Sequence, residues 1–159
     1  MDSIDRRILE VLQTDGRITN QDLADRIGLS PSPTLRRVRN LEQSGVISGY
    51  GAIVSPAALG LGVLAVIEIA IADHSTPQVE TFEQALRANP SIVAAHMIAG
   101  DGDYLITVLV RDLDDFERFV VDELRAIGNI ASIRSKFAFG TVKDRGPLLP
   151  PPQRPPRKQ

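Results

Sequence analysis

Arginines and small polar side chains come together in one short stretch, residues 30–42, with a spacing that suits the binding of an anion. Leu35, Val38 and Leu41 are spaced i, i+3, i+6, which predicts a helix that buries one apolar face. Prolines at the start of the stretch suit the first turn of a helix, because they have no amide hydrogen to leave unpaired. The polar residues off the apolar face are Ser32, Thr34, Arg36, Arg37, Arg39 and Asn40.

A basic helix opened by small polar residues is suited to the major groove of double-stranded DNA. Its N-terminal residues reach base edges there, and an arginine pairs with a guanine or with a backbone phosphate. We therefore predict that these six side chains form a DNA-binding surface. From this stretch alone, a surface helix whose basic face is merely solvated is an equal alternative, because charge runs usually serve solubility.

Two further helices precede the basic helix and would position it. Residues 3–13 carry apolar side chains at i, i+4, i+5 and i+8 and end at an Asp-Gly turn. Residues 19–27 begin with a threonine that suits an N-cap and end at Gly28. A helix followed by a helix–turn–helix, with the basic helix last, predicts an N-terminal helix-turn-helix DNA-binding domain over residues 1–48. A three-helix bundle with no role in nucleic-acid binding is the structural alternative.

Charge is unevenly distributed along the 159 residues, although the net charge is only −2. Residues 1–50 hold seven basic and seven acidic side chains, residues 51–130 hold four and twelve, and residues 131–159 hold seven and one. The middle of the chain would therefore repel nucleic acid, whereas the two ends would attract it.

No cysteine is present in the sequence, which excludes disulfides, thiolate metal sites and cysteine nucleophiles. The N-terminus is charged from Asp2 on, unlike a signal peptide. The longest apolar run, residues 57–67, is interrupted by Gly60 and Gly62 and is too short to span a bilayer. We expect a soluble cytoplasmic protein with no membrane partner.

The second half of the chain alternates strands and helices. Residues 46–54 predict a strand and a hinge, so that residues 49–62 form a hinge strand and linker. From there the predicted order is strand 63–72, helix 77–88, strand 92–99, strand 104–110, helix 112–126 and a last strand within 130–142.

This β-α-β-β-α-β order predicts a ferredoxin-like domain over residues 63–145. The whole chain is thus expected to be α+β, with the helix-turn-helix domain first. Two helices cover only one face of such a sheet, and a homodimer is the plain way to cover the other. Residues 146–159 are basic and rich in proline, which predicts a disordered or polyproline-type tail.

One turn of the second domain carries groups able to hold a small ligand, and its residues are Gly100, Asp101, Gly102, Asp103 and Tyr104. The glycines allow close approach to the backbone, exposed amides can hold a carboxylate, and the aspartates can hold an ammonium group. Met97, Ile98 and Ala99 lead into the turn and would line a side-chain pocket. From the chemistry alone, an ordinary hairpin turn is the favoured interpretation.

Catalytic and metal chemistry find little support in the sequence. His74 and His96 have no metal-ligating neighbour at a useful spacing, so surface or turn positions are expected for them. No Ser-His-Asp grouping, phosphate-binding loop or dinucleotide fingerprint is present. We expect no catalytic site, no metal site, no cofactor and no enzyme activity; a small metabolic enzyme with a ferredoxin-like domain is the distant alternative.

Over residues 2–145 the chain resembles the Lrp/AsnC family of leucine-responsive, feast/famine transcriptional regulators. The resemblance rests on several motifs in the right order: Asp5-Arg6-Arg7-Ile8-Leu9, Leu12-Gln13-Thr14-Asp15-Gly16-Arg17, Leu29-Ser30-Pro31-Ser32-Pro33, Leu35-Arg36-Arg37-Val38, Leu41-Glu42, Gly45-Val46-Ile47-Ser48-Gly49-Tyr50, Gly100-Asp101-Gly102-Asp103-Tyr104-Leu105, Phe137-Ala138 and Val142-Lys143. It implies a winged or plain helix-turn-helix domain, a hinge strand and an amino-acid-sensing domain. It also implies dimers that assemble further, often to octamers, and a ligand bound around the turn at residues 100–104, at a subunit interface.

The sequence departs from the family pattern at a few positions. Thr34 stands where a cysteine is frequent, and Asn40 stands where an arginine is frequent, which removes one positive charge from the DNA-facing side. Lys136 and Gly140 replace a more usual serine and lysine, and the proline-rich tail lies outside the pattern. The changes near the last strand leave the identity of the effector open.

Together these features predict a sequence-specific DNA-binding transcriptional regulator that forms homodimers and higher oligomers, with the octamer expected. Its assembly and DNA binding are expected to respond to a small amino acid. A ligand-independent architectural DNA-binding protein of the same fold is the alternative, and an effector-dependent change in mass or DNA affinity separates the two.

Overall fold

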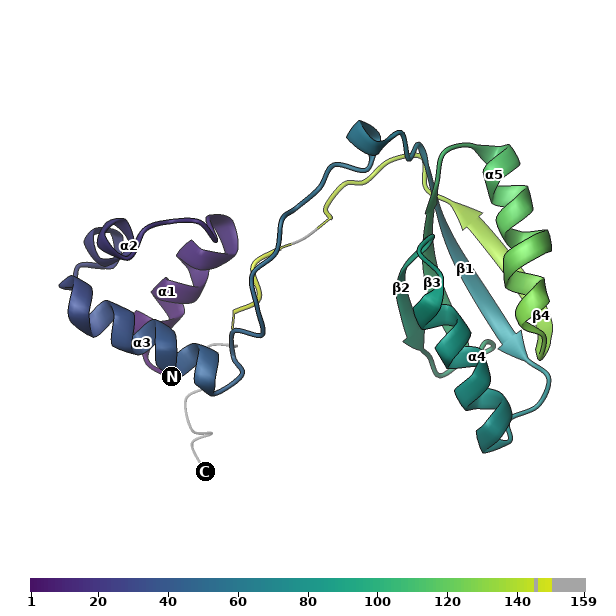
Figure 1. The fold of residues 1–159 in the computed structure, drawn as a ribbon, viewed down its shortest axis with the longest axis horizontal. Coiled ribbons are helices and arrows are strands. Elements are labelled where there is room, and N and C mark those ends of the chain that lie inside the picture. The colour runs from purple at the N-terminus through teal and green to yellow at the C-terminus, as the bar shows by residue number, and fades with distance from the viewer. Residues whose placement is uncertain (145, 150–159) are drawn as a thin grey trace, which may run out of the picture. The chain divides into compact units, whose positions relative to one another are not determined.

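The computed structural model describes residues 1–144 and 146–149. The chain forms two compact units, one of residues 1–53 with the C-terminal segment from Lys143 on, and one of residues 54–142. In chain order the elements are α1 (Ser3–Thr14), α2 (Asn20–Ile27), α3 (Pro31–Gln43), η1 (Ala57–Leu59), β1 (Val63–Ile71), α4 (Thr76–Ala88), β2 (Ile92–Met97), β3 (Tyr104–Val110), α5 (Leu113–Arg118), η2 (Phe119–Leu124), η3 (Arg125–Ile127) and β4 (Ile130–Phe137) (Figure 1). None of the helices in the described ranges is long and apolar enough to cross a lipid bilayer.

The first unit is a bundle of three helices closed by local caps. The Asp2 side chain accepts hydrogen bonds from the backbone amides of Ile4 and Asp5 at the start of α1. In turn, the Asp5 side chain accepts a hydrogen bond from the Asp2 amide. Gly28, with φ of 75°, ends α2 in a left-handed conformation. The buried core of the bundle consists of Ile8, Leu9, Leu23, Ile27 and Leu41. Within residues 1–48 the structure contains helices and no strand.

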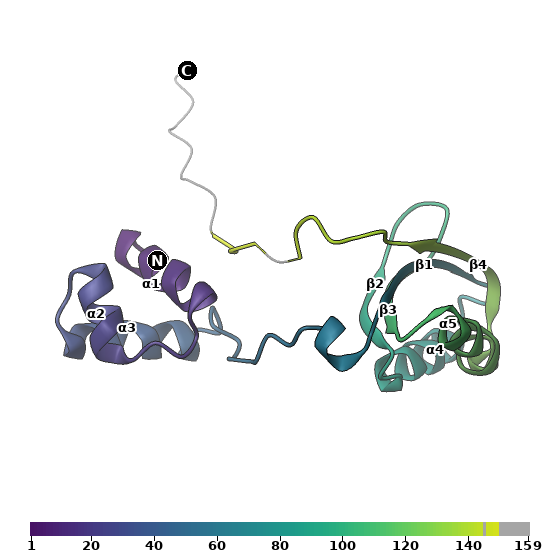
Figure 2. The same ribbon diagram turned by 90° about the horizontal axis from the view of Figure 1, so that it is seen from above.

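The second unit is a four-stranded antiparallel sheet in the order β2-β3-β1-β4. Figure 2 shows α4 and α5 together on one face of this sheet, which is the predicted ferredoxin-like arrangement. Side chains under the helices alternate with side chains on the opposite face. In β1 the alternation buries Ala65, Ile67 and Ile69 and leaves Val66 and Glu68 half-buried on the other side.

The uncovered side of the sheet is here called the bare face. The strand register places on it Leu64, Val66, Glu68, Leu105, Thr107, Leu109, Arg134 and Lys136. Glu68 and Arg134 lie opposite each other and form an ion pair of 2.8 Å. The bare face therefore combines a band of apolar side chains with a paired charge.

The helix predicted over residues 112–126 is continuous but changes its hydrogen-bond pattern twice. It runs as α5 to Arg118, widens to a π-helix in η2 and tightens to a 3₁₀ turn in η3. A π-helix bonds residue i to i+5, so residues five apart lie on one side. Phe119 and Leu124, which are five apart, are both buried in the core of the second unit.

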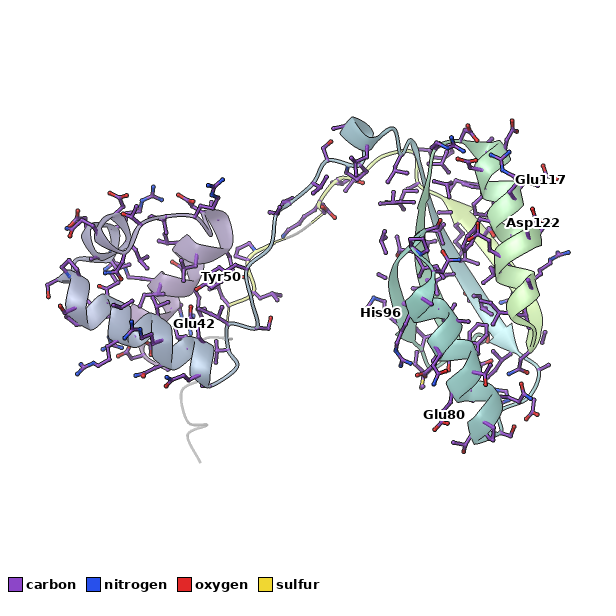
Figure 3. All side chains as sticks on the ribbon, in the orientation of Figure 1. Glu42, Tyr50, Glu80, His96, Glu117 and Asp122 are labelled. Atoms are coloured by element: carbon purple, nitrogen blue, oxygen red, sulfur yellow. The ribbon has the colours of Figure 1, made fainter. Side chains whose placement is uncertain are left out.

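The strand predicted within residues 46–54 is absent, and residues 48–55 have no regular secondary structure. A strand forms only where a second strand bonds its amides and carbonyls, and the described part of this chain offers none to the segment. Tyr50 fixes the segment instead, because its hydroxyl donates to Glu42 Oε1 at 2.9 Å (Figure 3).

Part of the segment predicted as a disordered tail is held in the first unit. The amide of Leu148 donates to Gln13 Oε1 at 2.7 Å, and Gln13 Nε2 donates to the Leu148 carbonyl at 3.0 Å. Residues 147–149 line a hollow of the first unit together with Leu9, Leu12 and Tyr50. The rest of the predicted tail, residues 150–159, lies outside the described residues.

Candidate functional site

Helix α3 turns two of its three predicted apolar side chains toward the bundle, and Thr34 takes the place of the third. The residues that face the bundle are Thr34, Val38 and Leu41, which are spaced i, i+4, i+7. Leu35, predicted to share that face, is instead 39% exposed and packs in neither core cluster. The prediction for Leu35 was wrong because a small hydroxyl-bearing residue, not the leucine, fits the close contact between helices.

Thr34 is fully buried, so the prediction that it contacts DNA was also wrong. Its hydroxyl donates to the Ser30 carbonyl at 2.9 Å, one turn earlier on the same helix. This bond satisfies the only buried polar side chain that the described residues contain in this bundle, and it allows Thr34 to sit in an apolar core. Thr34 therefore stabilises the start of α3 and cannot reach a base.

Arg37 is the second predicted DNA contact that the structure directs elsewhere. One Nη1 atom donates to Asp2 at 2.8 Å and to Asp5 at 2.7 Å, both at the start of α1. The Asp5 amide and then the Arg37 guanidinium hold the pKa of Asp2 below its ordinary value, and the two carboxylates raise the pKa of Arg37. Arg37 thus joins α3 to α1 and positions the helix.

The remaining predicted DNA contacts lie on the outer side of α3. Ser32, Arg36 and Arg39 are exposed and, together with Leu35, follow the spacing i, i+3, i+4, i+7, so the four side chains form one stripe. Asn40 is exposed beside this stripe. Neither Arg36 nor Arg39 forms an ion pair with a carboxylate of the described residues, in contrast to Arg37. This surface is called the α3 stripe below and provides two cations to an anionic partner.

The turn predicted to hold a ligand connects β2 to β3, and Asp103 anchors it internally. Asp103 Oδ2 accepts from the Ile71 amide at 2.8 Å, and Oδ1 lies 2.9 Å from His74 Nε2. The contact with His74, followed by the Ile71 amide, holds the pKa of Asp103 below its ordinary value. Both oxygens are engaged, so Asp103 fixes the turn to the end of β1 and does not present a free carboxylate.

Gly102 is the buried member of the same turn, and its missing side chain makes room for Glu68. A Cβ atom added at Gly102 would lie 2.7 Å from Glu68 Cγ. Gly100 has φ of 145°, in a region that favours glycine. Ala99, Gly100 and Asp101 are exposed, and Ile98 is half-buried, with its amide bonded to the Asp103 carbonyl at 2.9 Å.

Two of the predicted ligand residues border a hollow of about 180 Å³ between β2 and α4. Its lining consists of Glu83, Leu86, Arg87, Ala95, Met97 and Tyr104. Met97 is exposed at the end of β2, whereas Tyr104 is buried and donates its hydroxyl to Glu83 Oε1 at 3.2 Å. Burial, followed by the Glu83 charge, raises the pKa of Tyr104. The hollow thus has apolar walls and one ion pair, because Glu83 Oε2 also accepts from Arg87 at 2.5 Å.

Comparisons with known proteins agree with this division of the chain. Residues 64–148 match the family described as the Lrp/AsnC ligand binding domain, and residues 1–48 match a winged helix-turn-helix DNA-binding family. The leucine-responsive regulatory protein of Rhizobium meliloti is 39% identical over 144 residues, which cover 91% of this chain and 92% of that protein. The chain belongs to the Lrp/AsnC family.

Solved structures of Lrp/AsnC regulators show the same fold. A transcriptional regulator of Neisseria meningitidis, solved as its complex with L-Met, superposes with a TM-score of 0.89 at 34% identity, covering 93% of this chain and 96% of that one. An AsnC family transcriptional regulator of Agrobacterium tumefaciens gives 0.89 at 32% identity, with the same coverage. As a member of the family, the protein is a transcriptional regulator with a DNA-binding helix-turn-helix domain and a ligand-binding domain.

Sequence reasoning missed three residues with defined roles in these Lrp/AsnC domains. Asp2 and Asp5 hold Arg37, and the signal for this was an acidic pair in the first turn of α1, three residues apart, where a capping box forms. Glu83 faces the hollow from α4, and nothing in its local sequence distinguishes it from other helical glutamates. Contacts between distant elements decided all three roles.

Proposed function

We propose that this Lrp/AsnC protein binds specific DNA sequences through the α3 stripe and that a small amino acid controls its assembly and DNA binding. The observation that carries the proposal is the division of α3 into two sides. One side is fixed in the bundle, since Arg37 bonds to α1 and Thr34 and Leu41 are buried, and the other presents Arg36 and Arg39 without acidic partners in the described chain. We assign no catalytic step to the protein, and we place it in the cytoplasm with the DNA it regulates.

The exposed polar side chains on and beside the α3 stripe are suited to two kinds of DNA group, base edges and backbone phosphates. Arg36 and Arg39 each carry a planar guanidinium that pairs with two acceptors of a guanine or with a phosphate. Ser32, in the first turn of α3, and Asn40 carry short polar groups that bind phosphates or base edges. Specificity requires at least one base contact, because phosphate contacts are the same for every sequence.

The effector is proposed to bind around Met97, Gly100 and Asp101, with the rest of residues 97–104 shaping the site. The exposed turn supplies backbone amides, and the hollow beside Met97 supplies apolar walls with one charge of each sign. A zwitterionic amino acid with an apolar side chain matches these groups. The complex of the Neisseria relative with L-Met is consistent with such a ligand.

The bare face is proposed as the surface through which two copies of this chain associate, with further assembly to an octamer. Leu64, Val66, Leu105 and Leu109 place apolar side chains on this face of β1 and β3, with Leu64 directly opposite Leu109. Burying these side chains against a second copy removes them from water. An effector that binds near the edge of this sheet is then able to shift the assembly equilibrium and, by linkage, DNA affinity.

The DNA-binding proposal is tested with Arg36→Ala and Arg39→Ala, assayed on duplexes selected from a random pool by the unaltered protein. Loss of a phosphate contact lowers the salt dependence of log K by about one unit and weakens all duplexes alike, whereas loss of a guanine contact relaxes preference at one position. Arg125→Ala, an exposed arginine of the second unit, is the matched control. Unchanged affinity in both stripe variants at moderate salt contradicts the proposal.

The assembly proposal is tested by light scattering with and without each of the twenty amino acids. Leu109→Glu places a charge on the bare face and is expected to reduce the mass, whereas Val121→Glu, exposed on η2 away from that face, is the matched control. A change of mass or DNA affinity with one amino acid identifies the effector. If none of the twenty amino acids changes the mass or the DNA affinity, the alternative of a ligand-independent architectural protein is favoured.

A further inference from the structure

Leu35 is a large apolar side chain that lies in the open on the α3 stripe. It is 39% exposed, and the core clusters of the described residues do not include it. Its neighbours along the stripe are Ser32, one turn before, and Arg36 and Arg39 after it, all polar and exposed. Within α1, α2 and α3 it is the large apolar side chain that is exposed, since the others are buried or half-buried. Helix packing therefore leaves part of Leu35 uncovered.

The position of Leu35 on the helix selects what it can meet in DNA. It is the fifth of the thirteen residues of α3, in the N-terminal half that reaches base edges when such a helix lies in the major groove. A leucine side chain offers no donor or acceptor to a base. The apolar group that the major groove presents is the C5-methyl group of thymine, which is absent from cytosine, adenine and guanine.

We propose that Leu35 contacts the methyl group of a thymine and specifies that base in each half-site. This inference rests on the proposed use of the α3 stripe for DNA binding. Ser32, Arg36 and Arg39 surround the leucine and bind polar groups of the same duplex, so they hold Leu35 against the floor of the groove. Thr34, next to it in the chain, is turned into the core and does not compete for this contact.

The experiment uses the full chain and a duplex that the unaltered protein selects from a random pool. Each thymine of the duplex is replaced in turn by deoxyuridine, which removes the methyl group and keeps the base pair. At one thymine of each half-site, the substitution is expected to weaken binding by the unaltered protein about fourfold, the effect of one buried methyl group. Leu35→Ala is expected to bind the thymine and deoxyuridine duplexes equally, while Leu35→Met keeps the preference.

Three controls separate the possible failures. Leu35 is 39% exposed, so binding by Leu35→Ala is compared with the unaltered protein at a temperature where melting curves show both to be folded. Arg125→Ala is expected to keep the full preference for thymine. If the unaltered protein discriminates at no thymine, or if Leu35→Ala retains the discrimination, the inference about Leu35 is wrong although DNA binding stands. If the protein selects no duplex at all, the proposed DNA-binding function fails as well.

Discussion

Thr34 and Leu35 are neighbours in the chain, yet Thr34 is fully buried under α3 whereas Leu35 is 39% exposed on its outer side. One residue along a helix corresponds to a rotation of about 100°. The two side chains therefore point in different directions although they are adjacent in the chain. In this bundle Thr34 packs inward, and Leu35 lies beside the exposed Ser32, Arg36 and Arg39.

Replacement of Thr34 by valine tests this relationship. Valine keeps the volume but loses the hydroxyl that donates to the Ser30 carbonyl at 2.9 Å. The free energy of unfolding is expected to fall by about 1 kcal/mol, the usual contribution of one hydrogen bond. DNA affinity, measured where both proteins are folded, is expected to stay the same. A large loss of affinity without a loss of stability would instead place Thr34 at the DNA.

Removal of Arg37 is expected to act on stability rather than on DNA sequence preference. Arg37→Ala removes both bonds between α3 and α1, whereas Asp5→Ala removes one of them and keeps the bond to Asp2, so each is expected to lower the melting temperature. The double variant is expected to lose less than the sum of the two single losses, because either change already removes the Arg37–Asp5 contact. Arg17→Ala, an exposed arginine between α1 and α2, is the matched control. If the loss of stability in the double variant equals the sum of the two single losses, the contact between Arg37 and Asp5 is contradicted.

Acid is expected to weaken the anchor of the β2–β3 turn. The pKa of Asp103 in the folded protein lies below its ordinary value of 3.8, so its ionised form stabilises the fold above that value. This contribution is lost as the pH falls from 3.8 through the lower folded pKa. Asp103→Asn is therefore expected to reduce the free energy of unfolding at pH 7, and the gap to the unaltered protein is expected to shrink toward pH 3. A gap independent of pH would show that the carboxylate charge is not involved.

Gly102→Ala is expected to disturb the bare face from the ligand turn. The added methyl group would lie 2.7 Å from Glu68 Cγ, so Glu68 must move and its 2.8 Å ion pair with Arg134 must change. Because both charges lie on the proposed contact surface, light scattering is expected to show weaker assembly. Gly140→Ala, where an added Cβ meets nothing within 4 Å, is the control. If Gly102→Ala has the same mass as the unaltered protein, the turn does not affect assembly.

Gln13→Ala is expected to release the C-terminal segment from the first unit. The Gln13 amide makes both hydrogen bonds to the backbone of Leu148, so its loss exposes the Leu148 amide to water. Hydrogen exchange at Leu148 is expected to become faster, while exchange in α2 stays the same. Gln21→Ala, which removes a glutamine that bonds to Asp25 within α2, is the matched control.

Helix starts, turns and apolar runs along the chain were sufficient to predict most elements of both domains. Gly28 ends α2 where expected, and β1 and β3 form within the apolar runs predicted as strands. These features depend on neighbours a few residues away, which a sequence displays directly. The motifs from Leu29 to Glu42 also indicated the family, and the family matches confirm it. The strand predicted within residues 46–54 failed because a strand requires a partner that local sequence does not specify.

The amino-acid sequence by itself determined the α+β fold, the basic helix and the turn rich in glycine and aspartate. The tertiary structure alone decided which of these polar residues are available. Arg37 and Asp103 have suitable chemistry for binding, but Asp5 and His74, more than twenty residues away, already occupy them. Arg36 and Arg39 have the same side chain as Arg37 and stay exposed. Composition and spacing fix what a side chain can bind, whereas packing between distant elements fixes what remains within its reach.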